Sequence, residues 1–368
     1  MHLHRVLVRK KALAGNLSTR RRATAGIPVG VIGLGLMGTS IATCLLAAGH
    51  PVVGVEADPR RRQTARRRLQ KLLKEMRAEG LLAGDPSVIL CRFEVAATYH
   101  ALQHAQIIIE AITENPDAKK QVIAGVEREV AATAIIGSNT SAIPISLLQK
   151  GTAHPERILG MHWAEPAHVT RFMEIICGAQ TDRLNAERMR ELSRLWGKEA
   201  SIVRRDIRGF IANRCMYALL REAFHLVESG YATIEDVDRS LRNDLGYWIA
   251  FAGPFRYLDL TGIPAYETVM QDLLPDLCRS TKVPPLISDL VASGARGVSN
   301  ARGFYRYSSA SAKRWEKSFL EFTYDIRALA LKYPEGVGDD SRRAADRKSR
   351  AYRPCRSNAV HPYTARDG

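Results

Sequence analysis

The segment Ile27-Pro-Val-Gly-Val-Ile-Gly-Leu-Gly-Leu-Met-Gly38 decides the fold. Its first half has the composition of a short β-strand, and its second half is a Gly-x-Gly-x-x-Gly pattern leading into an apolar helix. In this context Gly33 permits a tight turn, Gly35 lets a pyrophosphate approach the backbone, and Gly38 lets helix and strand pack closely. The free N–H groups and the positive dipole end of the helix also attract a phosphate. We therefore predict a dinucleotide-binding turn, the alternative being a tight βα turn without a ligand; it comprises Gly33, Leu34, Gly35, Leu36, Met37 and Gly38.

Glu56 stands at the end of the next predicted strand, 51–55, and lies 23 residues after Gly33. A carboxylate there accepts hydrogen bonds from a ribose 2′-hydroxyl and repels a 2′-phosphate, so it favours NAD over NADP as the cofactor. The three arginines 60–62 follow and could offset this preference. We interpret the basic helix that they begin, 60–77, as a solvated face. Attraction of a phosphate-bearing substrate such as a coenzyme A is the alternative.

The remaining chain first alternates strands with helices and then becomes helical. Further strands are predicted at 106–112, 134–137, 158–161 and 173–176. This alternation is typical of an α/β fold, here a Rossmann-type NAD-binding domain with a mainly parallel sheet. After Asp206 the strand pattern stops, and one helical run extends over 209–229. We predict four parts: a basic, disordered leader (1–26), the Rossmann domain (27–206), an all-α C-terminal domain (207–335) and a disordered tail (336–368).

The composition is that of a soluble globular protein, with 46% hydrophobic and 25% charged residues among 368. The net charge of +16 resides mostly in the two ends, because 1–28 carries +7, 336–368 carries +4 and the body between them only +5. We therefore expect no nucleic-acid binding by the body. No apolar run approaches the 18 residues of a membrane helix. An Arg-rich leader without acids can also be an organelle transit peptide, which is the alternative to a plain extension.

Six cysteines are scattered along the chain without a Cys-x-x-Cys pair or a histidine at metal-ligand spacing. We expect reduced core thiols, no metal and a reducing compartment. The predicted location is the cytoplasm, or the mitochondrial matrix if the leader is a transit peptide.

Six further motifs follow one another along the chain. They are Ile109-Glu110-Ala-Ile-Thr-Glu114-Asn115 with Lys119, then Ser138-Asn139-Thr140-Ser141, Gly160-Met-His162-Trp, Glu174, Gly209-Phe-Ile-Ala-Asn213-Arg214 and Ala301-Arg-Gly-Phe-Tyr305. This ordered set resembles the L-3-hydroxyacyl-CoA dehydrogenase family over about residues 27–310. The resemblance implies NAD-dependent oxidation of a 3-hydroxyacyl-CoA to the 3-oxoacyl-CoA, a role in fatty acid β-oxidation, and a homodimer.

The resemblance also assigns residues to the reaction. It implies that His162 is the catalytic acid/base and Glu174 its partner, and histidine suits this role because it titrates near neutral pH. It places Ser141 and Asn213 at the reacting oxygen of the substrate, with Ser141 also beside the cofactor. Glu114 and Lys119 are expected on the ribose and nicotinamide side of NAD. The competing interpretations are a helix N-cap for Ser141, an inter-domain contact for Asn213, an exposed helix residue for Lys119 and a core histidine for His162.

Two positions depart from the family pattern. Glu165 precedes Pro166 where the family usually has Asn, and Arg208 stands where Pro is common. Glu165 either faces the active site or points to solvent. The segment 246–255 also looks closer to relatives that act on free hydroxy acids such as carnitine or sugar acids, so a free 3-hydroxy acid is the alternative substrate. A non-catalytic binding or structural protein that retains the fold is the alternative of another class.

Overall fold

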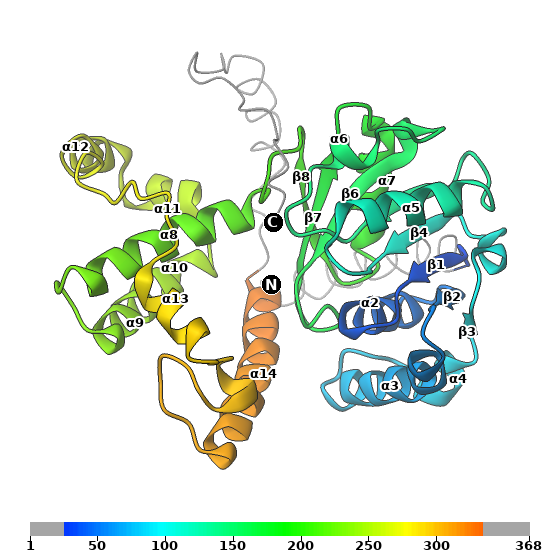
Figure 1. Cartoon of the computed structure of the whole chain (residues 1–368), viewed down its shortest axis with the longest axis horizontal. Coiled ribbons are helices and arrows are strands. Elements are labelled where there is room, and N and C mark those ends of the chain that lie inside the picture. Colours follow the sequence, from blue (N-terminus) through cyan, green and yellow to red (C-terminus); the bar gives the residue numbers. More distant parts are fainter. Residues whose placement is uncertain (1–25, 334–368) are drawn as a thin grey trace, which may run out of the picture.

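The computed structural model describes residues 26–333, which form a sheet-containing half and a helical half (Figure 1). The predictions of a disordered leader, a transit peptide and a disordered tail concern residues almost wholly outside this range. No helix within it is long and apolar enough to cross a membrane.

Eight short strands build one sheet in the order β3-β2-β1-β4-β5-β6-β7-β8. All neighbouring strands run parallel except β6 and β7, so the prediction of a mainly parallel sheet is confirmed. The two edge strands, β3 and β8, were not predicted. The bounds are β1 (Val29–Ile32), β2 (Val52–Val55), β3 (Phe93–Ala96), β4 (Ile107–Glu110), β5 (Ile135–Ser138), β6 (Ile158–Trp163), β7 (Phe172–Cys177) and β8 (Glu199–Val203).

The chain order around β1 positions the cofactor turn. Strand β1 pairs with β2 on one side and with β4 on the other, so the direction in which the chain adds strands reverses there. Ligands of open α/β sheets bind at such a switch point, outside the carboxyl ends of the strands. The Gly33–Gly38 turn follows β1 at this edge.

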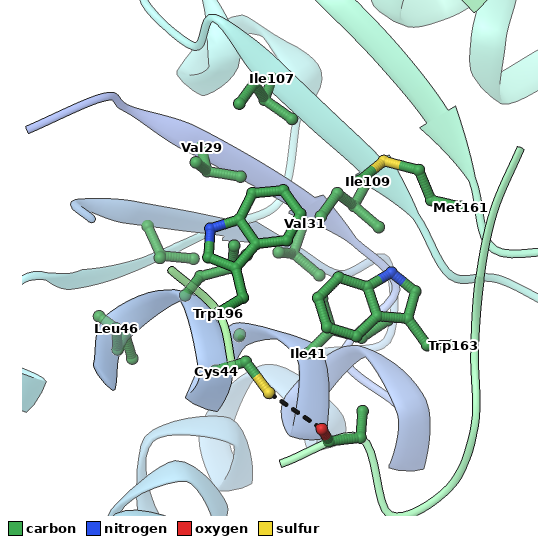
Figure 2. Close-up of a cluster of buried hydrophobic side chains, with 14 of the residues drawn as sticks. Val29, Val31, Ile41, Cys44, Leu46, Ile107, Ile109, Met161, Trp163 and Trp196 are labelled. Carbon is green, nitrogen blue, oxygen red and sulfur yellow. Dashed lines mark hydrogen bonds between the residues drawn. The ribbon is translucent and has the colours of Figure 1, made fainter. Parts of the chain in front are cut away.

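Helices cover both faces of the sheet and form two separate cores. One core packs α2, α3 and α7 against the sheet, and the other packs α5 and α6 against the opposite face. Ile107 and Ile109 point into the first core and Ile108 into the second, as the alternation of a strand requires. Figure 2 shows the first core, where Val29 and Val31 lie with Trp163 and Trp196. The helices of this half are α2 (Leu36–Ala47), α3 (Pro59–Ala78), α4 (Pro86–Leu90), α5 (Pro116–Glu127), α6 (Ile145–Leu148) and α7 (Arg183–Ser193), with short 3₁₀ turns η1 (Tyr99–Leu102) and η2 (Pro155–Arg157).

The helical half begins later than the sequence indicated. The predicted run 209–229 is helical only over α8 (Ala212–Glu228), because Gly209 and Phe210 have φ of 79° and 50° and form a turn. Six further helices follow: α9 (Ile234–Asn243), α10 (Leu245–Ile249), α11 (Pro254–Thr261), α12 (Ile263–Leu273), α13 (Pro285–Ala292) and α14 (Ser309–Lys332), with the 3₁₀ turn η3 (Val298–Asn300) before the last.

The helical half has almost no core of its own. Among its described residues, the buried apolar side chains are Phe210, Val237 and Ala312. Large apolar side chains are instead exposed along α8, α10–α12 and α14. In Figure 1 the helices α8–α13 stand apart from the sheet, and α14 lies between the two groups.

The described cysteines are all free, but they are not all core thiols as predicted. Cys44 and Cys177 are buried, whereas Cys91 and Cys215 are exposed. Cys91 is the C-cap residue of the short helix α4. Cys215 lies on α8, a helix without buried residues. Cys355 lies outside the described residues.

Candidate active site

The glycines of the turn after β1 have distinct local environments. A Cβ on Gly38 would lie 1.7 Å from the carbonyl oxygen of Gly33, so helix and strand approach as closely as predicted. Gly33 has a φ of 87°, and a Cβ there would lie 2.7 Å from the carbonyl oxygen of Ala111. A Cβ on Gly35 would meet nothing within 4 Å. The backbone at Gly35 therefore faces open space at the N-terminus of α2, where a phosphate can approach it.

This open space is part of a cleft of about 650 Å³. The Glu56 side chain lies against the turn, since its two carboxylate oxygens accept hydrogen bonds from the backbone N–H of Leu34 (2.8 Å) and of Asp58 (3.0 Å). Arg61 and Arg68 of α3 add positive charge to the lining, whereas Arg62 donates to the carbonyls of residues 56 and 57. The lining comprises Gly33, Gly35, Leu36, Met37, Glu56, Arg61, Arg68, Ala111, Ile112, Thr113 and Asn139. A bare helix N-terminus, an open glycine and a carboxylate at the end of β2 suit the pyrophosphate and ribose of NAD.

His162 and Glu174 are brought together by the antiparallel pairing of β6 and β7, in which they are register partners. His162 Nδ1 lies 2.9 Å from Glu174 Oε2, and Glu174 is 1% exposed. With Nδ1–H donating to the carboxylate, the neutral imidazole keeps Nε2 as an acceptor. His162 and Glu174 are therefore in contact, which their spacing of twelve residues alone could not establish.

Glu174 also joins the two halves of the molecule. Its Oε1 accepts hydrogen bonds from the backbone N–H of Ile211 (3.1 Å) and Ala212 (3.0 Å) at the start of α8. The positive end of the α8 dipole thus faces the carboxylate. The rings of Phe172 and Phe210 lie 5.3 Å and 5.7 Å from the His162 ring, and these apolar neighbours limit its motion.

Ser141 and Asn213 meet across the same boundary. The Asn213 side-chain Nδ2 donates to the Ser141 carbonyl oxygen at 2.9 Å. The Ser141 N–H donates to Glu114 Oε1 at 2.8 Å, and Thr140 Oγ1 donates to the same oxygen at 2.6 Å. Ser141 does not cap α6, whose N-cap residue is Pro144, so the N-cap interpretation is wrong.

Lys119 is fully buried, so the interpretation as an exposed helix residue is wrong. Its ammonium lies 2.8 Å from Glu110 Oε1 and 3.6 Å from Glu114 Oε2. Glu110 in turn accepts hydrogen bonds from Ser138 Oγ and from the N–H of Ile112, which lines the cleft. Lys119 is therefore linked to the lining of the cleft through Glu110.

Several site residues had no role in the sequence analysis. Glu110, Asn139 and Phe210 were quoted within motifs, but only their contacts reveal what they hold. Asn139 Oδ1 accepts the Trp163 N–H at 3.1 Å, which ties the end of β5 to the residue after His162. An acidic residue directly after a continuous apolar run, as Glu110 is, was the signal that the sequence offered.

Glu165 lies at an exposed position of the loop between β6 and β7. Partial burial of its carboxyl group raises its pKa. This exposed position agrees with both alternatives for Glu165, a side chain that points to solvent and one that borders an open cleft.

Comparisons with known proteins divide the chain at the same place as the two halves of the structure. Residues 28–207 match the family model of the 3-hydroxyacyl-CoA dehydrogenase NAD binding domain, and residues 209–307 match that of its C-terminal domain. A 5-formyl-3-hydroxy-2-methylpyridine 4-carboxylate 5-dehydrogenase of Mesorhizobium japonicum is 33% identical over 285 residues, covering 77% of this chain and 92% of that protein. A 3-hydroxybutyryl-CoA dehydrogenase of Mycobacterium tuberculosis is 32% identical over 286 residues, covering 76% and 98%.

The similar solved structures include a pyridine-carboxylate dehydrogenase and 3-hydroxybutyryl-CoA dehydrogenases, as the similar sequences do. The structure of a 5-formyl-3-hydroxy-2-methylpyridine 4-carboxylic acid 5-dehydrogenase, described as an NAD⁺-dependent dismutase, superposes with a TM-score of 0.77 at 30% identity and covers 84% of this chain and 100% of that chain. The (S)-3-hydroxybutyryl-CoA dehydrogenase of Ralstonia eutropha gives a TM-score of 0.63 at 30% identity and covers 76% and 99%.

The fold, the open glycine turn and these matches together define an NAD-dependent oxidoreductase. Within that class, the chain belongs to the 3-hydroxyacyl-CoA dehydrogenase family.

Proposed function

We propose that the protein catalyses the reversible, NAD-dependent oxidation of a 3-hydroxyacyl-CoA to the 3-oxoacyl-CoA. The observation that carries this proposal is the contact between His162 and Glu174 beside the carboxyl end of the sheet. A protein kept only for binding has no need of this pair held by two backbone N–H groups, so we favour an enzyme over a non-catalytic relative.

His162 acts as the acid/base in this proposal. When bound, NAD⁺ accepts a hydride from the carbon that bears the hydroxyl group. His162 Nε2 takes the hydroxyl proton, and the Glu174 carboxylate at 2.9 Å stabilises the imidazolium that forms. Ser141 and Asn213 are neutral hydrogen-bond donors, which suits an oxygen that becomes a carbonyl. Glu114 and Lys119 support Ser141 and the ribose side of the cleft.

The positive charge on α3 favours a coenzyme A ester. Arg61 and Arg68 line the cleft beside the cofactor turn, where a phosphate-bearing substrate gains from their guanidinium groups. In this proposal Arg61 and Arg68 of the basic helix contact the substrate, and the rest of the helix remains a solvated face.

A free carboxylic acid is the second candidate substrate. The relative named for a pyridine carboxylate gives a TM-score of 0.77, against 0.63 for the 3-hydroxybutyryl-CoA dehydrogenase of Ralstonia eutropha. A panel of 3-hydroxyacyl-CoA esters, free 3-hydroxy acids and aromatic hydroxy acids, each assayed with NAD⁺ and NADP⁺ by absorbance at the NADH maximum, separates the two. A kcat/KM at least tenfold higher for the esters supports the first candidate, and the reverse ranking supports the second.

We also propose that the helical domain, 207–335, completes its core with a second copy of the chain. Exposed apolar residues lie along α14 at spacings of four, three and seven residues, at Trp315, Phe319, Phe322 and Leu329. A cavity of about 440 Å³ lined mainly by apolar side chains of α8, α9 and α13 lies in the same domain. Exposed large apolar side chains grouped on one helix, beside an apolar cavity, are typical of an interface.

The oligomeric state tests this proposal. Sedimentation equilibrium should give twice the chain mass, and Phe319→Glu should shift the equilibrium toward the monomer. Lys317→Glu on the same helix, at an exposed position, is the matched control and should leave the dimer intact. A wild-type chain that stays monomeric would contradict the proposal.

The free thiols of the described cysteines lead us to propose a reducing compartment, the cytoplasm, with the mitochondrial matrix as the alternative.

A further inference from the structure

Lys198 is a buried cation without an acidic partner. It immediately precedes β8, and its side chain is almost completely covered. Among the described residues, no carboxylate lies within ion-pair distance of its ammonium. Burying an unpaired ammonium is costly, so its contacts must stabilise it in another way.

The contacts of Lys198 all lead to the segment that joins the catalytic strands. Its ammonium donates hydrogen bonds to the carbonyl oxygens of Ala167 and Thr170, in the loop 164–171 between β6 and β7. It also lies 5.0 Å from the ring centroid of Trp163, the residue directly after His162. Trp163, labelled with Trp196 in Figure 2, stacks on Trp196 with ring centroids 5.6 Å apart. The ammonium therefore lies over one ring of a stacked aromatic pair.

Other elements hold the same loop. Cys44 of α2 donates to the Ala167 carbonyl at 3.1 Å, drawn as a dashed line in Figure 2. Ser40 of α2 accepts the His168 backbone N–H at 3.0 Å and contacts its Nδ1 at 2.8 Å. The helix whose N-terminus faces the cofactor cleft is thereby tied to the loop.

Helix α14 supplies the last anchor. Arg327 Nη1 donates to the carbonyls of Val169 (2.7 Å) and Gly197 (3.4 Å). Helix α14 lies beyond residue 307, where the match to the family's C-terminal domain ends. The contact therefore links a segment outside the family match to the loop between the two catalytic strands.

We propose that Lys198 is a positioning residue of the active site, and that its ammonium and the Arg327 guanidinium together fix the loop 164–171 so that His162 keeps its place beside the substrate. The proposal rests on the proposed function for its kinetic part. Three of the carbonyl oxygens that the two cations hold, those of Ala167, Val169 and Thr170, belong to this loop, so the loss of either cation would remove a donor from the loop.

This arrangement depends on the charge of Lys198. Burial lowers the pKa of Lys198 to about 8; Cys44 opposes the shift and Arg327 adds to it. The other titratable group of the loop that faces it, His168, has its pKa lowered to about 4 by burial and by Lys198, and it is neutral at pH 7. Above pH 8 the neutral amine keeps two N–H donors but loses the charge that attracts the carbonyls and the Trp163 ring.

The first test compares Lys198→Met, Lys198→Arg and Arg327→Met with Lys317→Met, an exposed lysine of α14, as the control. We expect Lys198→Met to lower kcat by about 10- to 100-fold, the cost of a small misplacement of reacting groups, with NADH affinity preserved. Hydrogen–deuterium exchange should rise in 164–171 in the Met variants of Lys198 and Arg327, and not in β1 or β4. Lys198→Arg retains a charge at all accessible pH values, so its kcat at pH 7 should be close to that of the wild type. Between pH 7.5 and 9.5 we expect kcat/KM of the wild type to fall relative to that of Lys198→Arg.

Two results would overturn the proposal. Wild-type kcat and wild-type exchange in Lys198→Met would show that the ammonium does not hold the loop. A uniform rise in exchange over the whole sheet, with NADH binding lost, would show a lysine needed only for folding. The exchange measurement uses no substrate, so it decides the question even if the panel finds no activity and the proposed function fails.

Discussion

His162 and Glu174 lie opposite each other on antiparallel strands, with Nδ1 and Oε2 2.9 Å apart, and the second carboxylate oxygen is held by the first N–H groups of α8. The pair is therefore oriented from both halves of the molecule. A shift of α8 would move the carboxylate, and through it the imidazole. In the proposed mechanism, the acid/base chemistry therefore depends on where α8 lies.

The two glycines of the cofactor turn should respond differently to alanine. Gly38→Ala puts a Cβ 1.7 Å from the Gly33 carbonyl, so we expect it to lower the melting temperature and to abolish NADH binding. Gly35→Ala puts its Cβ into open space, so the melting temperature should stay the same while NADH affinity falls. Calorimetric melting and NADH fluorescence titration measure both. An unchanged NADH affinity in Gly35→Ala would show that the pyrophosphate does not approach there.

Glu56 should set the preference for NAD. Glu56→Gln keeps one of the two oxygens that accept from the Leu34 and Asp58 N–H groups, and it removes the charge that repels a 2′-phosphate. We expect the ratio of kcat/KM for NAD⁺ and NADP⁺ to fall by about tenfold, as one lost charge interaction of roughly 1.4 kcal/mol predicts. A wild type that prefers NADP⁺ would mean that Arg61 and Arg68 outweigh the carboxylate.

Two buried histidines should make stability fall in acid. Burial lowers the pKa of His50, whose ring nitrogens contact the Ile27 carbonyl and Trp196 Nε1, and lowers that of His168 to about 4. Because the unfolded chain binds these protons near pH 6.5 and the folded chain does not, the stabilisation is present above pH 6.5 and is lost as the pH falls toward 4. The free energy of unfolding should fall by up to about 1.4 kcal/mol per pH unit for each group. Denaturant titrations at pH 7.5, 6 and 5 measure it. The dependence of the unfolding free energy on pH should become weaker in His168→Gln and stay unchanged in the control His104→Gln, whose side chain is exposed. The same dependence on pH in the wild type and both variants would refute the assignment.

The Glu165→Asn substitution tests the position where the chain departs from its family. If Glu165 faces the substrate, its charge favours the protonated imidazole, and the optimum for oxidation should move to lower pH when the charge is removed. Neutral or cationic substrates should lose their advantage over anionic ones. The pH profile and substrate ranking of both proteins provide the readout. If neither changes, Glu165 is a solvent-facing loop residue.

The sequence predicted the centre of the fold well and its periphery poorly, for physical reasons. The central strands are covered on both faces, so they appear as continuous apolar runs, whereas the edge strands β3 and β8 each keep exposed polar positions such as Glu94 and Ser201 and lack that signal. The start of α8 was misplaced because a positive φ at Phe210 follows from tertiary packing against His162, not from local preference. Lys198 showed no signal in the sequence, because its neighbours along the chain are ordinary and the carbonyls that its ammonium contacts lie at least 28 residues away.

The most direct test of the central claim is a double-mutant cycle on His162 and Glu174, the proposed acid/base pair. His162→Gln should lower kcat by about 10² to 10⁴, the usual contribution of general acid–base catalysis, while NADH affinity stays near the wild-type value. Glu174→Gln should also lower kcat, and the double variant should be little slower than His162→Gln alone, because the two residues act as one unit. Retained turnover in His162→Gln, or losses that multiply in the double variant, would contradict the account.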